Sequence, residues 1–232
     1  MRVLVTGAAG GIGSATAKQL EQLGHTVVRH DARDAPGMDL VGDLTDPHTL
    51  ERIYLTCDAV GVDAVAATHG RSGAGRVIEA DPASVRDVVR VNTTSVFALY
   101  ESVGGLIAGR GGAFTVVSSQ SGLDGEAENG FYCASKFALL GWARAAAVLD
   151  GSPRLRVVCP GMVDTALLRA GLDGMARAAG ETFEDLLERR LSTIPSGRLG
   201  RPEEIGRAIV WLLELRTPAC VVAAVTGGET FD

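Results

Sequence analysis

The chain has 232 residues, of which 46% are hydrophobic and 22% charged, and this length supports one sizeable core but is short for two. Its 28 acidic and 22 basic side chains give a net charge of -6 with no run of Lys or Arg, which argues against nucleic acid and anionic membranes as partners. We therefore expect a single globular domain over residues 1–232.

The cysteines and the apolar runs indicate the compartment. Cys57, Cys133, Cys159 and Cys220 are far apart and show neither the density of a disulfide framework nor a CxxC metal spacing. They are typical of reduced, partly buried thiols, so no metal site is expected. The first apolar run meets Gly7 too soon for a signal peptide, and no later run approaches the ~18 residues of a membrane span. We expect a cytoplasmic protein.

A glycine-rich turn follows the first predicted strand. Residues 3–5 are β-rich, residues 6–13 read TGAAGGIG, and apolar residues then recur at helical spacing. A turn between a strand and a helix leaves free N–H groups at the helix start, and glycine lets a phosphate approach the backbone. A glycine-rich turn alone also fits an ordinary loop, but the flanking strand and helix favour a bound dinucleotide.

The second predicted strand, residues 26–30, ends at Asp31, which lies 18 residues after Gly13. An acid about 20 residues beyond the turn is typical of one that binds the adenosine ribose. Because a carboxylate accepts hydrogen bonds from both ribose hydroxyls and repels a 2′-phosphate, Asp31 favours NAD over NADP. Arg33 is the counter-argument, since an arginine at this place can pair with that phosphate.

The connection from Asp31 to Asp43 is too short for a crossover helix, so we expect a loop and a third strand at residues 38–41. A helix around residues 50–57 and a fourth strand at residues 63–67 follow. A long helix is then predicted from Ser84 through Asn92 to about residue 106. Asn92 is unusual inside a helix, because its side chain competes with the backbone for hydrogen bonds.

Strands and helices continue to alternate in the second half. A fifth strand at residues 113–117 ends at Ser118 and Ser119, and a polar loop, residues 122–130, leads into a helix that contains Tyr132. A sixth strand covers residues 155–159, a last helix starts at residue 201, and a final strand covers residues 220–225. This alternation predicts an α/β fold, a doubly wound parallel sheet of about seven strands with helices on both faces (a Rossmann fold).

Residues 162–196 have a helical pattern that we expect Gly171, Gly174 and Gly180 to interrupt, and we interpret residues 165–195 as a mobile lid. The apolar residues of this segment could line a substrate pocket or simply be the buried face of an amphipathic helix, and the pattern does not separate the two. These apolar residues are Leu167, Leu168, Leu172, Met175 and Phe183. Candidates for the pocket mouth are Gly125, Glu126 and Glu128.

Tyr132 and Lys136 are four residues apart, a spacing that puts a phenol and an ammonium on one face of a helix. A nearby cation lowers the pKa of a tyrosine, so the two could form an acid/base pair. The same spacing also arises by chance in Ala-rich helices. The pair therefore needs support from residues elsewhere in the chain.

That support comes from a family whose motifs occur here in order: over nearly its whole length the chain resembles a single-domain short-chain dehydrogenase/reductase. The family's TGxxxGxG turn matches residues 6–13, and its serine matches Ser119, thirteen residues before Tyr132. The resemblance implies a catalytic tetrad of Asn92, Ser119, Tyr132 and Lys136. It implies cofactor contacts from Thr6, Gly7, Gly11, Ile12, Gly13, Asp31, Asp43, Leu44, Tyr132, Lys136, Pro160, Gly161, Val163 and Thr165.

The resemblance also implies a role for each tetrad member. Tyr132 would take the alcohol proton during oxidation and return it during reduction. A phenol with a pKa of about 10 needs roughly 4 kcal/mol of preferential stabilisation of its anion to act as a base near pH 7. Lys136 and the cationic nicotinamide would supply it, and Lys136 would also hold the nicotinamide ribose. Ser119 would donate to the substrate oxygen, and Asn92 would hold a water that links Lys136 to solvent.

One departure from the family pattern lies after the fourth strand, where Ala67-Thr68-His69-Gly70 stands in place of Asn-Asn-Ala-Gly. We expect it to alter support near the adenosine more than the chemistry, and His69 is given no role. Near the end of the chain, residues 225–228 resemble the family's last-strand motif. Assembly as a homodimer or homotetramer is expected.

The sequence thus predicts an NAD-dependent oxidoreductase that interconverts a secondary alcohol and a ketone, with a small-molecule substrate of unknown identity. A non-catalytic dinucleotide-binding or sensing protein is the alternative, and the intact tetrad argues against it. A nucleotide-sugar epimerase or dehydratase would need a larger substrate domain than the stretch after Pro160 offers.

Overall fold

The computed structural model describes residues 1–75, 80–217 and 220–230. Its strands form one seven-stranded sheet in the order β3-β2-β1-β4-β5-β6-β7, and every pair of neighbours is parallel. The strands are β1 (Arg2–Thr6), β2 (Thr26–Asp31), β3 (Leu40–Val41), β4 (Ala64–Ala67), β5 (Ala113–Val117), β6 (Arg154–Pro160) and β7 (Val221–Val225). The predicted doubly wound α/β fold is confirmed.

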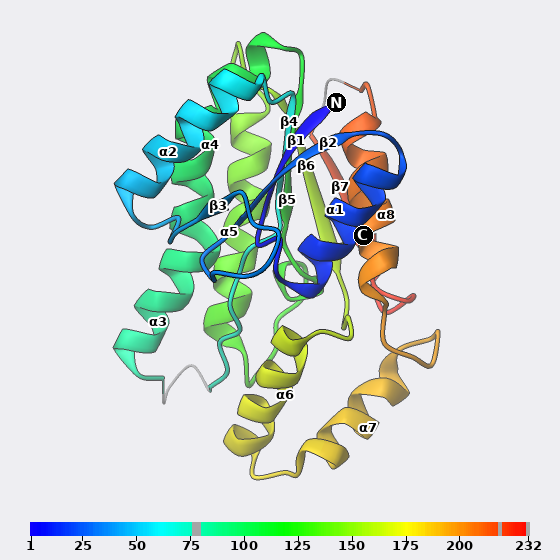
Figure 1. Cartoon of the computed structure of the whole chain (residues 1–232). Coiled ribbons are helices and arrows are strands. Elements are labelled where there is room, and N and C mark those ends of the chain that lie inside the picture. The colour runs from blue at the N-terminus through cyan, green and yellow to red at the C-terminus, as the bar shows by residue number, and fades with distance from the viewer. Residues whose placement is uncertain (76–79, 218–219, 231–232) are drawn as a thin grey trace.

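Helices cover both faces of this sheet and its carboxyl edge (Figure 1). They are α1 (Gly11–Gln22), α2 (Pro47–Val60), α3 (Pro82–Val89), α4 (Ser95–Gly109), α5 (Gly130–Ala146), α6 (Ala166–Ala179), α7 (Phe183–Thr193) and α8 (Pro202–Glu214), with a π-helical turn η1 (Arg90–Thr94) and a 3-10 turn η2 (Gln120–Gly122). Figure 1 shows α2, α4 and α5 on one side of the sheet and α1 and α8 on the other, while α6 and α7 lie beyond the ends of the strands.

The alternation of side chains along each strand builds two cores, one on each face. In β1, Leu4 faces the α2–α4–α5 layer, whereas Val3 and Val5 face α1 and α8, and all three are fully buried. Burying one such side chain stabilises the fold by about 1.5–3 kcal/mol. Because both faces are covered, the strands are nearly continuous apolar runs, as in other buried parallel sheets.

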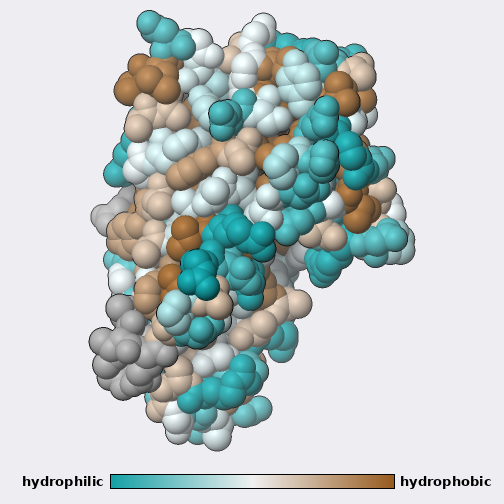
Figure 2. Space-filling view, turned by 90° about the vertical axis from the view of Figure 1, so that its left-hand side faces the viewer, coloured by the Kyte–Doolittle hydropathy of each residue, from teal (hydrophilic) through white to brown (hydrophobic). Residues whose placement is uncertain are grey.

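Figure 2 shows hydrophobic and hydrophilic side chains interspersed on the α2 side of the molecule. Leu55 and Val60 of α2 are among the exposed hydrophobic residues. None of the helices in the described part of the chain combines the length and apolar character that crossing a membrane requires.

Two expected elements differ in detail from the structure. The third strand is shorter than predicted, because the Asp39 carboxylate, rather than a backbone carbonyl, accepts the Arg29 N–H at 2.8 Å. The long helix around Asn92 starts at Pro82 and changes to a π-turn at η1, which brings Asn92 into a buried position. Figure 1 shows α3 and α4 following one another along the same side of the molecule.

The expected interruption of the 162–196 segment at Gly171 and Gly174 is wrong. Both glycines lie inside α6, and only Gly180, with φ 72°, ends that helix. A Cβ at Gly174 would lie 2.7 Å from the Ala74 Cβ, which is too close, whereas one at Gly171 would lie 3.5 Å from the Ser72 Cβ, an ordinary contact distance. Gly174 therefore lets α6 approach Ala74 across the carboxyl edge of the sheet.

Glycines at two places give a paired stability test. Gly24 ends α1 with φ 80° and donates to the Glu21 carbonyl, whereas Gly105 is exposed inside α4, and a Cβ would meet nothing within 4 Å at either position. Gly24→Ala should lower the free energy of unfolding by about 1–2 kcal/mol because alanine resists the left-handed conformation. Gly105→Ala should raise it by roughly 0.5–1 kcal/mol through helix propensity. Urea unfolding measures both, and equal shifts of the same sign would contradict this account.

Candidate active site

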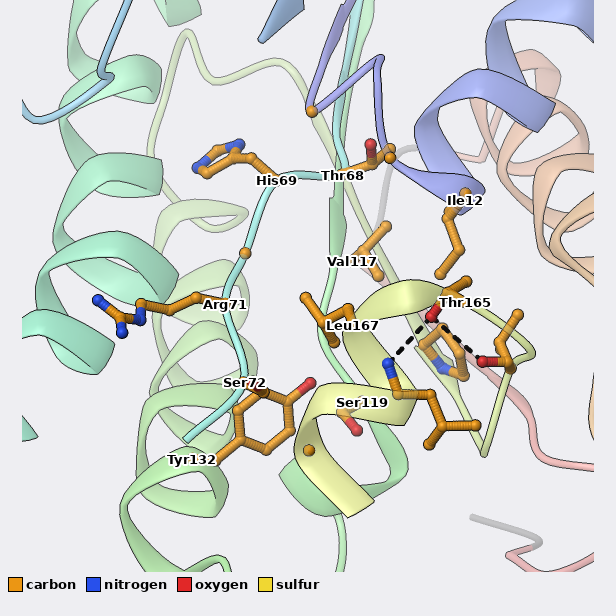
Figure 3. A pocket seen from close by; sticks show the side chains of 18 of the residues that line it. Ile12, Thr68, His69, Arg71, Ser72, Val117, Ser119, Tyr132, Thr165 and Leu167 are labelled. Atoms are coloured by element: carbon orange, nitrogen blue, oxygen red, sulfur yellow. Dashed lines mark hydrogen bonds between the residues drawn. The ribbon is translucent and has the colours of Figure 1, made fainter. Parts of the chain in front are cut away.

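A cavity of about 650 Å³ opens at the carboxyl edge of the sheet. Its walls come from the turn between β1 and α1, from the ends of β2, β4, β5 and β6, and from α5, α6 and α7. Figure 3 shows Tyr132 and Ser119 in the lower part of the view, with Thr165 and Leu167 between them and the β1–α1 turn. Carboxyl ends of parallel strands are where open α/β sheets bind ligands.

The turn between β1 and α1 is shaped by approaches that only glycine permits. Gly7 has φ 71°, and a Cβ on Gly13 would lie 2.1 Å from the Gly7 carbonyl oxygen. A Cβ on Gly11 would lie 2.7 Å from the Thr165 Cγ2, so this turn also packs against the start of α6. The first turn of α1 faces the cavity, which gives an anion-binding helix N-terminus beside a backbone that a ligand can approach closely.

Asp31 ties the end of β2 to this turn. Its Oδ2 accepts a hydrogen bond from the Ala9 N–H at 3.0 Å, and its Oδ1 accepts from the backbone N–H and the Nε of Arg33 at 2.9 and 3.2 Å. Burial of Asp31 opposes its ionisation, but the hydrogen bonds from Arg33 and Ala9 outweigh it and lower the pKa of the carboxyl. Asp31 is therefore a buried carboxylate on the cavity wall, with the largely exposed Arg33 held against it.

Thr6 does not line the cavity but supports the turn from behind. Its Oγ1 donates to His69 Nδ1 at 2.7 Å, and His69 Nε2 donates to Ser95 Oγ at 2.9 Å, because Ser95 Oγ itself donates to the Val91 carbonyl. Burial, reinforced by the nearby Lys136, lowers the pKa of His69 to about 3, so this imidazole is neutral. His69 thus connects the end of β1 with the start of α4, a role that sequence reasoning missed.

The remaining predicted cofactor residues lie along the cavity. Asp43 and Leu44 line the wall beyond β3, and the Asp43 carboxylate accepts the Thr45 N–H at 2.9 Å. Pro160, Gly161, Val163 and Thr165 form the opposite wall. Thr165 caps α6 by accepting the Leu168 N–H at 3.2 Å and donates to the Val163 carbonyl at 3.2 Å, the two bonds drawn in Figure 3.

Lys136 is 3% exposed, and its Nζ donates to the Val117 carbonyl at 3.0 Å. The ammonium lies 5.7 Å from the centroid of the Tyr132 ring, so the two side chains do share one face of α5. Burial lowers the pKa of Lys136 to about 8, which leaves it largely protonated at neutral pH.

In this structure the pKa of Tyr132 shifts in the direction opposite to the one expected from Lys136. Burial raises the pKa to about 12, the Ser119 side chain partly offsets the rise, and the Glu126 carboxylate adds to it. The phenol is therefore protonated at neutral pH in the protein alone. Desolvation of the buried phenol is the largest cause of this shift, and the Lys136 ammonium, 5.7 Å from the ring centroid, does not reverse it.

Ser119 lies beside Tyr132 on the cavity wall (Figure 3). Its Oγ accepts the Ser121 N–H at 3.1 Å, which caps η2 and fixes the side chain. A hydrogen bond between the Ser119 side chain and the phenol opposes the rise in the pKa of Tyr132, so the serine hydroxyl is directed at the place where a ligand oxygen could take over this bond. This arrangement suits a group that donates to a substrate oxygen.

Asn92 lies in the π-turn η1 and, like Thr6, does not line the cavity. Its amide donates to the Arg71 carbonyl at 3.0 Å and to Ser135 Oγ at 3.1 Å, while its Oδ1 accepts the Arg71 N–H at 2.8 Å. A Cβ on Gly70 would lie 3.3 Å from Asn92 Oδ1 and 3.5 Å from Lys136 Nζ, so both polar atoms flank Gly70. Asn92 therefore locks the segment after β4 against α5.

Sequence reasoning missed most of the cavity's far end. Glu126 was a candidate for the mouth and lines the cavity, whereas Gly125 and Glu128 do not. The further residues that sequence reasoning missed are Gln120, Ser121, Arg190 and Glu229. Of the apolar candidates in residues 165–195, Leu167, Leu168 and Met175 line the cavity, whereas Leu172 and Phe183 do not. Within residues 1–75, 80–217 and 220–230, no group of His, Cys, Asp and Glu side chains is arranged to hold a metal ion.

The sequence and the fold are similar to those of known proteins. A family model described as enoyl-(acyl carrier protein) reductase matches residues 7–227. The chain is 33% identical to the 3-oxoacyl-(acyl-carrier-protein) reductase of Pseudomonas aeruginosa, over 90% of this chain and 88% of that protein. It is 32% identical to the cis-4-hydroxycyclohexanecarboxylate dehydrogenase of Sinomonas cyclohexanicum, over 98% and 95%.

Solved structures share the fold at lower identity. A short-chain dehydrogenase family protein from Francisella tularensis superposes with a TM-score of 0.84 at 24% identity, covering 98% of both chains. Levodione reductase superposes with a TM-score of 0.88 at 24% identity, covering 98% of this chain and 96% of the other. These structures bear on the fold alone.

The neutral state of His69 predicts a pH dependence of stability. Because its folded pKa is about 3 and an unfolded histidine has 6.5, the unfolded chain binds an extra proton between these values, so stability falls as pH drops below 6.5. His69→Asn should remove about 1.4 kcal/mol per pH unit from that slope. Urea unfolding at pH 4.5 to 7 measures it. His48→Asn, at an exposed histidine, is the control and should keep the wild-type slope.

Proposed function

The chain belongs to the short-chain dehydrogenase/reductase family and is a pyridine-nucleotide oxidoreductase, and on that premise we propose that it interconverts a secondary alcohol and a ketone by hydride transfer with NAD(H). One observation carries the proposal: Ser119, Tyr132 and Lys136, from β5–η2 and α5, meet at one wall of a cavity whose other end is the glycine turn. That is the arrangement needed to hold a substrate oxygen next to a dinucleotide.

Tyr132 is the proposed general acid and base. With a pKa of about 12 the phenol holds its proton, which suits donation to the carbonyl oxygen during reduction. When bound, the nicotinamide supplies or takes the hydride and, in its oxidised form, places a positive charge near the phenol. For oxidation Tyr132 must lose its proton, and the positive charge of Lys136, 5.7 Å from the ring centroid, would favour the phenolate.

Ser119 and Asn92 complete the proposed tetrad. The Ser119 O–H, which lies within hydrogen-bond reach of the Tyr132 hydroxyl, would donate to the substrate oxygen and stabilise the charge that develops there. Asn92 would hold a water that links Lys136 to solvent. Since both amide hydrogens and one lone pair of Asn92 are engaged, the water would use the second lone pair of Oδ1 or the backbone carbonyl.

A non-catalytic dinucleotide-binding protein is the second candidate. It would need the glycine turn and Asp31 but has no use for a protonated phenol beside a serine hydroxyl at the cavity wall. A substrate panel discriminates the two. The names of the relatives suggest that it include 3-oxoacyl thioesters and cyclic hydroxy acids. A homodimer or homotetramer and a cytoplasmic location stay predictions.

Tyr132→Phe should lower turnover of any substrate found in that panel by about 10²- to 10⁴-fold, because no group replaces the phenolic proton. Dinucleotide binding should persist, since the ring stays in place. Tyr54→Phe, at an exposed tyrosine of α2, is the matched control and should match the wild type. Near-full turnover by Tyr132→Phe would show that the proposed mechanism is wrong.

NAD is the proposed cofactor, on the strength of the buried Asp31 carboxylate at the cavity wall. Arg33 supports NADP instead if its guanidinium, 3.2 Å from Asp31, turns to a phosphate. Asp31→Ala should weaken NAD binding and free Arg33, so that the preference moves towards NADP. Titration calorimetry with both dinucleotides measures the change, with Asp34→Ala as the control on the same loop. Tighter binding of NADP than of NAD by the wild type would overturn the assignment.

A further inference from the structure

An ion pair crosses the far end of the cavity between two segments that the proposed chemistry does not use. Arg190 Nη2 of α7 lies 2.7 Å from Glu126 Oε2, in the loop that leads into α5. The side chains are 21% and 19% exposed, and in each of the other ion pairs of the described residues at least one partner is more than a quarter exposed. Such a pair is screened less by salt and solvent than one on the surface.

Hydrogen bonds continue from this pair to Ser119. The Ser121 hydroxyl donates to Glu126 Oε1, and the Ser121 N–H donates to Ser119 Oγ at 3.1 Å. Arg190 Nη2 also approaches Met175 Sδ of α6 at 3.9 Å. Arg190 therefore connects α6 and α7 with the loop that fixes the serine hydroxyl, and Glu126 is the residue through which it does so.

Glu126 also acts on Tyr132 through its charge. Burial raises the pKa of Tyr132, and the Glu126 carboxylate adds to this rise. Burial also raises the pKa of the neighbouring Cys133 thiol, where the charge of Glu126 adds to the rise and the charge of Arg190 opposes it. The groups that face the phenol are Ser119 from the end of β5, Glu126 from the loop, and Cys133 and Lys136 from α5. Among these, Glu126 is the anion, and Arg190 is its partner.

We propose that Arg190 is a positioning residue for the reaction: its ion pair with Glu126 fastens α7 across the substrate end of the cavity and balances the carboxylate that lies beside Tyr132. The inference rests on the proposed function, because it assigns Tyr132 the acid/base step. A pair with a purely structural role would hold α7 but leave the titration of Tyr132 unchanged.

The first test is the pH dependence of kcat/KM for alcohol oxidation in Arg190→Gln, Glu126→Gln and the double variant. Arg190→Gln should move the acid limb to higher pH by about half a unit and lower the rate at pH 7 roughly threefold, because the unbalanced Glu126 disfavours the phenolate. Glu126→Gln should move the limb the other way, and the double variant should return close to the wild type.

Two further variants separate charge from shape. Arg190→Lys keeps the cation and should keep the wild-type pH profile. Arg189→Gln is the matched control. Arg189 is the preceding residue of α7, pairs with Glu181 and is half exposed, so the pH profile of this variant should match the wild type. If the acid limb of the pH profile does not shift in Arg190→Gln, or if adding Glu126→Gln does not reverse the shift, the proposed electrostatic role of Arg190 is overturned.

The second test, hydrogen exchange of α7, needs no turnover. Peptides from residues 183–193 should exchange roughly two- to tenfold faster in Arg190→Gln and in Glu126→Gln, with peptides from α1 unchanged. Exchange at the wild-type rate in both variants would overturn the fastening of α7. If the wild-type protein oxidises no alcohol and reduces no ketone, the proposed function fails, and the exchange result still decides whether Arg190 holds α7.

Discussion

The burial of one ammonium group constrains the whole centre of this molecule. Lys136 is 3% exposed and donates to the Val117 carbonyl at the end of β5, so α5 must pack closely against that strand. Two features make the approach possible: a Cβ on Gly122 would lie 3.0 Å from the Lys136 backbone, and Ser118 Oγ donates to the Lys136 carbonyl at 2.9 Å. Removing a charge from water costs free energy, and the hydrogen bond from Lys136 Nζ to the Val117 carbonyl offsets part of that cost. Tyr132, one turn earlier, is placed by the same packing.

The π-turn at Asn92 holds the opposite side of α5. Asn92 donates to Ser135 Oγ, and Thr93 Oγ1 donates to the Ser135 carbonyl at 2.9 Å, so two consecutive residues of η1 are hydrogen-bonded to one residue of α5. A π-turn inserts an extra residue into the helix and redirects the side chains that follow. A regular α-helix through this segment would not present both side chains to α5. The local departure from helical geometry therefore lies where the sequence places an asparagine that disfavours a regular helix.

The sequence predicted the parts of this structure that depend on local chemistry. The seven strands follow from apolar runs, and the glycine turn follows from the order of Thr6, Gly7 and Gly13. The sequence did not predict features that depend on tertiary approach. Gly171 and Gly174 looked like helix breaks because their packing partners, Ser72 and Ala74, lie a hundred residues away. The direction of the Tyr132 pKa shift was missed for the same reason, since burial is a property of the assembled fold.

His69 illustrates the same limit at a single position. In the sequence it is one residue in a polar loop, and a lone histidine there is usually a hydrogen-bonded residue of no special importance. Its significance comes from Thr6 and Ser95, which reach it from β1 and α4 and fix which nitrogen carries the hydrogen. No spacing within the chain indicates this bridge, because its three members lie in three separate segments.

The two ends of the cavity differ in how far their walls consist of backbone or of side chains. This difference explains why the chemistry is easier to infer than the substrate. At the end formed by the glycine turn, part of the wall is backbone, and a Cβ on Gly13 would lie 2.1 Å from the Gly7 carbonyl oxygen, so a side chain at this position is excluded. At the far end the wall includes the side chains of Glu126, Met175 and Arg190. Exchanging those side chains requires no change of backbone. Under the proposed function, the fold therefore fixes where the hydride and proton steps would take place, whereas the choice of alcohol or ketone would depend on the few side chains that α6, α7 and the loop before α5 bring to the far wall.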